Sequence, residues 1–158
     1  MDVAFRKIDI DAFDEEILQE SELYEQDPRD PAQALDEMKQ AQASVRSFLA
    51  RNDTAGALSL VLQSAPYGPT MEEAKIVSLQ TLLTILNSTK ATEIPAVVKS
   101  LSQDLQDTLM KYLYKGMAMI GSGSGDTNAS VLLTWHEKLT EAAGTGCIVR
   151  TMTDRRTV

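Results

Sequence analysis

Two side chains of this sequence could take part in nucleophilic chemistry. Cys147 is the one cysteine of the chain and His136 is the one histidine. A catalytic thiol needs a base that takes its proton, and these residues lie eleven positions apart on separate expected helices. The sequence leaves open whether the fold brings them together, so a small helical hydrolase is one hypothesis. A small buried thiol is favoured, because free cysteines are mostly buried.

The same histidine begins a segment that resembles half of a zinc motif. His136-Glu137 matches the first two positions of H-E-x-x-H, but Thr140 stands where the second histidine should be. The motif needs both imidazoles, four residues apart on one helical face, to hold the metal. We therefore expect no metal site here, and a structural or interface role for His136.

Two further segments resemble ligand-binding loops without completing them. Counted from Asp9, the twelfth residue is Glu20, as a calcium-binding EF-hand loop requires, but the sixth is Asp14 instead of glycine. The glycine-rich residues 121–125 are followed by Asp126, whereas a phosphate-binding loop continues with lysine. We expect an acidic strip and a flexible linker, with no cofactor and no small-molecule substrate.

The net charge of −8 is confined to the N-terminal part of the chain. Residues 1–30 hold eleven acidic and three basic residues, while residues 31–158 hold twelve of each. Acidic segments repel phosphate groups, so nucleic acid and anionic membranes are poor candidate partners. The asymmetry predicts an acidic arm at residues 1–29 and a helical domain at residues 30–158.

The composition also bears on the compartment. With one cysteine the chain cannot form an internal disulfide, which is typical of a reducing compartment such as the cytoplasm. It contains no run of about 18 apolar residues, and its N-terminus lacks the apolar centre of a secretory signal. We therefore expect a cytoplasmic protein without a membrane span.

Apolar side chains are spaced along the arm without a helical period. Ile8 and Ile10 alternate with Asp9 and Asp11, which is typical of extended backbone. A segment with so many charged residues cannot bury enough apolar surface to fold alone. We therefore expect it to become ordered on a partner. The apolar positions of the strip are Phe5, Ile8, Ile10, Phe13 and Ile17.

The remainder of the chain is predicted to be all-α, with about seven helices in an irregular bundle or solenoid. Asp30-Pro31 should begin the first helix, since aspartate caps helices and proline suits the first turn. Thr70 and Glu73 fit a capping box. The other expected starts or breaks are Asn52 or Asp53, Thr92, Ser102, Thr127, and Gly144 with Gly146.

Two predicted helices carry distinctive faces. The helix after Thr70 is apolar on nearly all sides, from Ile76 to Leu86, which predicts a central position. The helix after Thr127 should bury Leu132, Trp135, Leu139 and Ala142. Tyr114 and Met119 lie off the main face of their own helix and are candidates for an interface.

Three segments of the chain resemble one protein family. They are F-R-K-I-D-I-D-A-F-D-E at residues 5–15, L-M-K-Y-L-Y-K-G at residues 109–116, and L-L-T-W-H-E-K at residues 132–138, the last leading through G-T-G-C-I-V-R to R-T-V at the C-terminus. In these segments the chain is similar to subunit 5, the smallest subunit, of the actin-related protein 2/3 complex. The match is spread over the whole chain in the same order.

The resemblance implies a non-catalytic helical subunit of an assembly that nucleates branched actin filaments. In that family the body docks on the β-propeller subunit 1 and on subunit 4, while the arm reaches the actin-related protein 2 subunit. Contact with actin filaments is made through the assembly, in the actin cytoskeleton. ATP belongs to the actin-related subunits, which agrees with the incomplete phosphate loop here.

These considerations lead to a hypothesis about the binding residues. Phe5, Ile8, Ile10 and Phe13 should anchor the arm on its partner, while Arg6, Lys7, Asp9 and Asp11 set register and specificity; Tyr114 is the candidate on the body. The alternative is a free helical adaptor with an acidic recognition tail.

Overall fold

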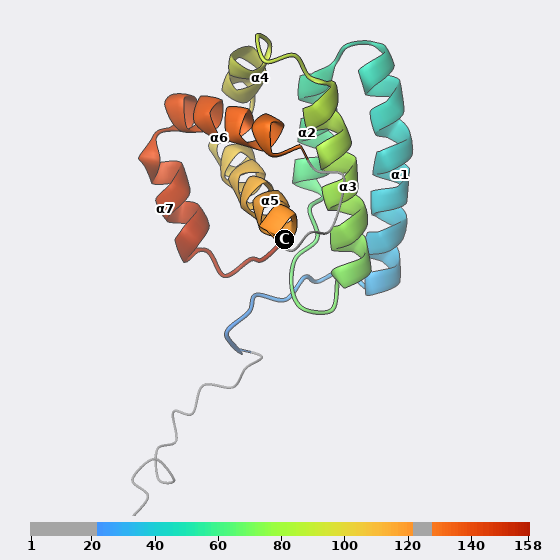
Figure 1. Ribbon diagram of the computed structural model, residues 1–158. Coiled ribbons are helices and arrows are strands. Elements are labelled where there is room, and N and C mark those ends of the chain that lie inside the picture. The colour runs from blue at the N-terminus through green and yellow to red at the C-terminus, as the bar shows by residue number, and fades with distance from the viewer. Residues whose placement is uncertain (1–21, 122–127) are drawn as a thin grey trace, which may run out of the picture.

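A computed structural model describes residues 22–121 and 128–158 of the chain, and over these ranges it contains seven helices and no strand (Figure 1). The prediction of an all-α fold with about seven helices is confirmed. The elements are α1 (Pro31–Ala50), α2 (Thr54–Gln63), α3 (Glu72–Ser88), α4 (Ile94–Ser100), α5 (Gln103–Gly121), α6 (Ala129–Ala143) and α7 (Thr145–Thr153). No helix in the described ranges is long and apolar enough to cross a membrane.

Short polar side chains begin three of these helices. Asp30 accepts a hydrogen bond from the Ala32 amide at 3.2 Å, with Pro31 in the first turn of α1. Asp53, not Asn52, caps α2 by accepting from the Gly56 amide at 2.9 Å. Such caps satisfy amides that have no partner within the helix.

Four predicted helix boundaries are wrong. One is the start of α4, which is preceded by Glu93 instead of the predicted Thr92. Thr70 does not cap α3, because the helix begins after Met71, whose side chain is buried and whose carbonyl accepts from the Lys75 amide at 2.9 Å. The sixth helix is capped by Asn128 instead of Thr127. Gly144, with a φ of 74°, alone separates α6 from α7, and Gly146 lies inside α7.

The helices pack as two groups that meet along α2 and α3, since α2 also contacts α4 and α5. Helix α1 packs on α2 and α3, whereas α5 packs on α6 and α7, and α4 covers part of α6. Figure 1 shows the first group at one side of the molecule and the second at the other. Because α3 contacts α1, α2, α5 and α6, its predicted central position is confirmed.

The core is centred on large side chains of α3, α5 and α6. Trp135 is fully buried, and its indole nitrogen donates to the Leu86 carbonyl at 3.3 Å. Gly116 allows α5 to approach α6, since a Cβ there would lie 3.1 Å from Leu132 Cδ1. A second, smaller core joins α1 to the start of α3 through Ala34, Met38, Ala41, Met71 and Ala74.

Two apolar side chains of α3 and α6 are exposed, and one of them, Ala142, was predicted to be buried. Ile76 is 54% exposed on α3, because that helix is apolar on so many sides that one flank has no neighbour. In α6 it is Ala143, not Ala142, that packs against the core formed by Leu132, Trp135 and Leu139. The buried face of α6 therefore continues from Leu139 to the fourth residue after it and not to the third.

Candidate protein-binding site

The predicted arm residues lie outside the described part of the chain. Phe5, Arg6, Lys7, Ile8, Asp9, Ile10, Asp11 and Phe13 all precede residue 22, and their role stays a prediction. The same holds for the predicted glycine linker, apart from Gly121 at the end of α5. The segment at which the predicted arm joins the helical body is described, and we call it the arm root (residues 25–29).

The arm root is fastened to the body through Arg29. Its guanidinium donates to Asp27 Oδ1 at 2.9 Å, to Glu37 Oε2 at 2.9 Å, and to the carbonyls of Ser64 and Ala65 at 3.1 and 3.2 Å. The hydrogen bond from Arg29 holds the pKa of Asp27 below its ordinary value, although burial acts in the opposite direction. Several hydrogen bonds from one guanidinium stabilise the position of the arm root more than an isolated surface ion pair would.

The backbone of the arm root packs on the loop between α2 and α3. Gly68 in this loop has a φ of 88°, a conformation that favours glycine. A Cβ at this position would lie 3.4 Å from the Glu25 carbonyl oxygen and 3.5 Å from the Asp27 nitrogen. The loop and the arm root are therefore in direct backbone contact.

The C-terminal tail (residues 154–158) returns to the same place. Arg156 Nη2 donates to Glu25 Oε1 at 2.6 Å, and its guanidinium lies 4.9 Å from the centre of the Tyr67 ring. The Arg156 hydrogen bond lowers the pKa of Glu25 below its ordinary value. Val158, the last residue, is only 8% exposed. Three segments that are distant in sequence thus meet at one surface.

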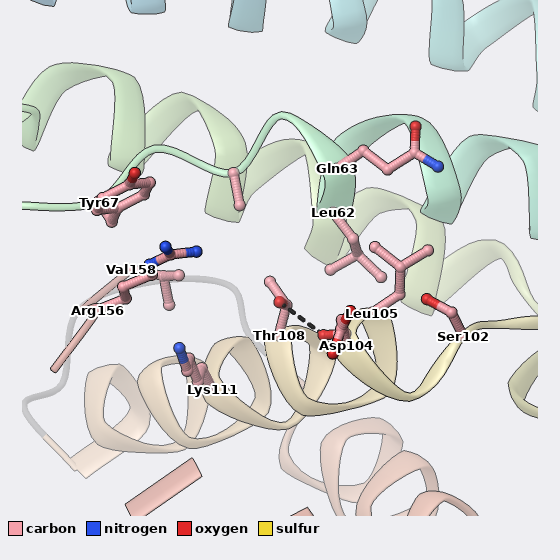
Figure 2. A pocket seen from close by; sticks show the side chains of 11 residues that line it. Leu62, Gln63, Tyr67, Ser102, Asp104, Leu105, Thr108, Lys111, Arg156 and Val158 are labelled. Atoms are coloured by element: carbon pink, nitrogen blue, oxygen red, sulfur yellow. Dashed lines mark hydrogen bonds between the residues drawn. The ribbon is translucent and has the colours of Figure 1, made fainter. Parts of the chain in front are cut away.

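Beside this junction lies a cavity of about 380 Å³ between the loop after α2 and helix α5. Figure 2 shows Tyr67, Arg156 and Val158 along one side of it, facing α5 residues such as Lys111 across the opening. Tyrosine and arginine are enriched in the energetically dominant parts of protein interfaces. The lining of the cavity combines apolar side chains with charged ones.

Tyr114 is half-buried at the surface of α5. Its hydroxyl lies 3.2 Å from His136 Nε2, and the two rings meet edge to face with centroids 5.5 Å apart. Tyr114 also lines a shallow depression together with Lys115 and Met152, and Met152 is 64% exposed. His136 therefore has a structural partner, and Tyr114 borders an accessible apolar surface.

A third depression was not anticipated from the sequence. It lies between α3 and α5, has a volume of about 250 Å³, and is lined mainly by apolar side chains, among them Ile76, Leu83 and Met119. Ile76, which is 54% exposed, lines this groove. Met119, predicted as an interface candidate, also packs against the main core.

The groups considered for catalysis are not arranged for it. Cys147 is fully buried, its sulfur lies 3.7 Å from the Gln106 carbonyl, and burial together with the nearby Asp107 carboxylate raises the pKa of its thiol to about 12. A nucleophilic cysteine needs the opposite shift. Nowhere in residues 22–121 or 128–158 do three or more His, Cys, Asp or Glu side chains gather as a metal site would require.

Sequence reasoning missed the residues that build the junction. Asp27 and Arg29 were assigned to the predicted arm, and no position was predicted for Arg156 or Val158. The one local signal was Arg29, the single base within residues 8–30, which is unusual in so acidic a segment. Contacts between residues 25, 67 and 156 leave no periodic pattern that a sequence could display.

Comparison with known proteins gives consistent matches over the whole chain. A sequence profile of the family described as ARP2/3 complex 16 kDa subunit (p16-Arc) matches residues 4–158. The chain is 37% identical to actin-related protein 2/3 complex subunit 5-C of Xenopus laevis over 98% of this chain and 94% of that protein. It is 34% identical to actin-related protein 2/3 complex subunit 5 of Saccharomyces cerevisiae over the full length of both. It is 32% identical to the human subunit 5-like protein over 98% and 94% of the two chains.

Proposed function

The chain belongs to the ARP2/3 complex 16 kDa subunit (p16-Arc) family, and from this premise we propose that it tethers subunits within the actin-related protein 2/3 complex. It is a structural subunit of that complex and contributes to nucleation of branched actin filaments. The observation that carries this conclusion is the family match through residues 4–158, which includes the arm as well as the body. The resemblance noted in three sequence segments is thereby confirmed.

The match argues against a free adaptor. An adaptor that had merely acquired an acidic tail would resemble the family in its body alone, whereas the similarity begins at residue 4. The hydrolase hypothesis is also disfavoured, since the relatives are described as complex subunits and Cys147 is buried with a raised pKa. No cofactor or small-molecule substrate enters the proposal.

Within the assembly the arm and the body have different partners. The body, residues 30–158, docks on the β-propeller subunit 1 and on subunit 4, and Tyr114 with the adjoining exposed Met152 contributes to one of these contacts. The arm, residues 1–29, reaches the actin-related protein 2 subunit. Contact with actin filaments occurs through the assembly, which places the protein in the cytoplasm at the actin cytoskeleton.

An anchored arm root suits tethering. A strip with separated apolar residues binds weakly by itself because it must become ordered on its partner. Attachment to a docked body makes that binding intramolecular, which raises overall avidity by roughly 10²- to 10⁴-fold. The hydrogen bonds of Arg29 to Glu37, Ser64 and Ala65 supply this attachment close to the start of α1.

Truncation of the arm tests the proposal. We expect a complex reconstituted with a chain lacking residues 2–15 to assemble around the body, but to lose the actin-related protein 2 subunit during dilution and to nucleate fewer branches. Retention is measured by gel filtration of the diluted complex, and branching by microscopy of labelled filaments. Normal retention together with normal branching in the truncated complex would refute the proposal.

A pair of full-length variants separates apolar anchoring from charge. Changing Phe5, Ile8, Ile10 and Phe13 together to alanine should reproduce the truncation, because it removes the proposed anchors. Changing Glu15, Glu16, Glu20 and Glu22 together to glutamine should leave retention nearly intact. The reverse ranking would assign binding to the glutamates at positions 15–22 instead of the apolar anchors.

A further inference from the structure

We infer that the C-terminal tail is a strap that fixes the arm root on the body, and that Arg156 is a positioning residue for the arm. The inference rests on the proposed tethering function, since it concerns the direction in which the tether leaves the body. It assigns a role to residues at the opposite end of the chain from the arm. The sequence gives no local indication of this role.

Arg156 connects two segments that must move together if the arm is to be held. Its guanidinium pairs with Glu25 at 2.6 Å and stacks over Tyr67 at 4.9 Å. The Tyr67 amide in turn donates to Asp27 Oδ2 at 3.4 Å. One cationic side chain therefore closes a ring of contacts that contains the arm root and the loop after α2. An arginine can pair and stack at once because its guanidinium is planar.

The tail is itself held on both sides of Arg156. Before it, Asp154 pairs with Lys111 of α5 at 2.6 Å, and Asp154 Oδ1 accepts from the Arg156 amide at 3.0 Å. After it, Val158 is buried against the main core. A strap requires both ends to be fixed, because otherwise its middle residue would follow the arm instead of restraining it.

The strap extends the restrained part of the chain from Asp27 back to Glu25. Arg29 and Asp27 fasten the chain to the body by themselves, whereas the Glu25 carboxylate is held by Arg156 and the Glu25 backbone only lies against Gly68. Without Arg156 the chain before Asp27 could swing away from the surface that carries Tyr67. If the arm can leave the body in a wider range of directions, its effective concentration at the binding site on the neighbouring subunit is lower.

A distance measurement on the full-length chain tests the strap directly. Spin labels are attached at Leu23→Cys, which is 50% exposed, and at Ser44→Cys on the exposed side of α1. The buried Cys147 thiol, with its raised pKa, should not compete for the label. Pulsed electron paramagnetic resonance then reports the distribution of distances between position 23, two residues before the arm root, and position 44 on the body.

Charge reversal provides the decisive comparison. Arg156→Glu places like charges together and should broaden the distance distribution, while the swap Glu25→Arg with Arg156→Glu should narrow it again. Arg155→Glu is the matched control, because Arg155 is exposed and makes no ion pair with any residue that the structure describes. Val158→Asp, which puts a charge at the buried end of the tail, should broaden the distribution independently of Glu25. Circular dichroism confirms that each variant keeps its helical content.

The outcomes separate the strap from the tethering function. A narrow distribution in Arg156→Glu, or a swap that fails to restore it, would overturn the strap even if arm truncation still releases the actin-related subunit. If the distances change as expected but truncation has no effect, the strap stands and tethering is refuted. If the strap and the tethering function are both correct, Arg156→Glu should weaken retention of the actin-related protein 2 subunit by up to about fivefold, which corresponds to the loss of one exposed ion pair. This effect should be smaller than the effect of truncation.

Discussion

Ser78 of α3 and Tyr112 of α5 share a hydrogen bond of 2.7 Å between their hydroxyl oxygens in the interior of the body. Ser78 is 0% exposed and Tyr112 is 1% exposed, so neither hydroxyl can turn to water. Burial raises the pKa of Tyr112 to about 12, with the Ser78 bond acting in the opposite direction. The pair links the buried faces of α3 and α5.

The two hydroxyls should show strong coupling in a double-mutant cycle. Tyr112→Phe or Ser78→Ala alone leaves one buried hydroxyl without a partner, so each should lower the free energy of unfolding by about 1–3 kcal/mol. The double variant should cost less than the sum, because no polar group is then left unsatisfied. Urea unfolding followed by the fluorescence of Trp135, the one tryptophan, measures all four proteins. Additive losses would show that the bond contributes nothing of its own.

Much of the helical body follows from local signals in the sequence. Asp30 followed by Pro31 and the cap at Asp53 gave correct starts for α1 and α2, because cap chemistry depends on neighbouring residues. Helix α3 begins after Met71 and not after Thr70, because burial of Met71 between α1 and α3 outweighs the capping preference of Thr70. Local rules failed where tertiary packing chose between adjacent residues.

The junction of arm, loop and tail could not be predicted in the same way. Arg156 and Glu25 are 131 residues apart, and each is an ordinary charged residue in its own segment. Their pairing depends on the returning path of the tail after α7, which no periodicity encodes. The exposure of Ile76 was missed for a related reason: a helix apolar on nearly all sides does not reveal which flank lacks a neighbour.

Acid should destabilise the body through carboxylates that are paired in the folded state. Asp107 accepts two hydrogen bonds from Arg150 at 2.6 and 2.9 Å, which join α5 to α7. Burial acts to raise the pKa of Asp107, but the bonds from Arg150 and Cys147 outweigh it and lower the pKa below its ordinary value. The pKa of Asp27 is lowered as well, through Arg29.

The direction of the pH effect follows from these shifts. A carboxylate whose pKa is lower in the folded protein stabilises it above the unfolded pKa, near 4. That contribution is lost as the pH falls from about 5 through the folded pKa. We expect the urea midpoint to fall over this range. Asp107→Asn should reduce the free energy of unfolding at pH 7 by up to about 1 kcal/mol, and it should also reduce the dependence of the midpoint on pH. Asp36→Asn on the exposed side of α1 is the control and should change neither.

Gly68 allows a test of the contact between the loop and the arm root. Gly68→Ala should cost about 1–2 kcal/mol for the positive φ alone, because the new Cβ would make ordinary contacts of 3.4 Å or more. Gly68→Leu adds a side chain that must displace residues 25–27, so it should cost more and also broaden the distance distribution between positions 23 and 44. Equal losses in stability and unchanged distances for the two variants would mean that the loop does not support the arm root.

Cys147 should be chemically inert as long as the protein is folded. The thiol is fully buried against α5 with its pKa raised to about 12, so at pH 8 it is neither accessible nor ionised. We expect a thiol-specific chromogenic reagent to react at the rate of global unfolding, and at once in denaturant. Cys147→Ser should leave assembly and branch nucleation unchanged, with a loss of about 1–2 kcal/mol in stability from the buried hydroxyl. Rapid reaction in the folded protein, or loss of nucleation in Cys147→Ser at unchanged stability, would give the thiol a function that its burial argues against.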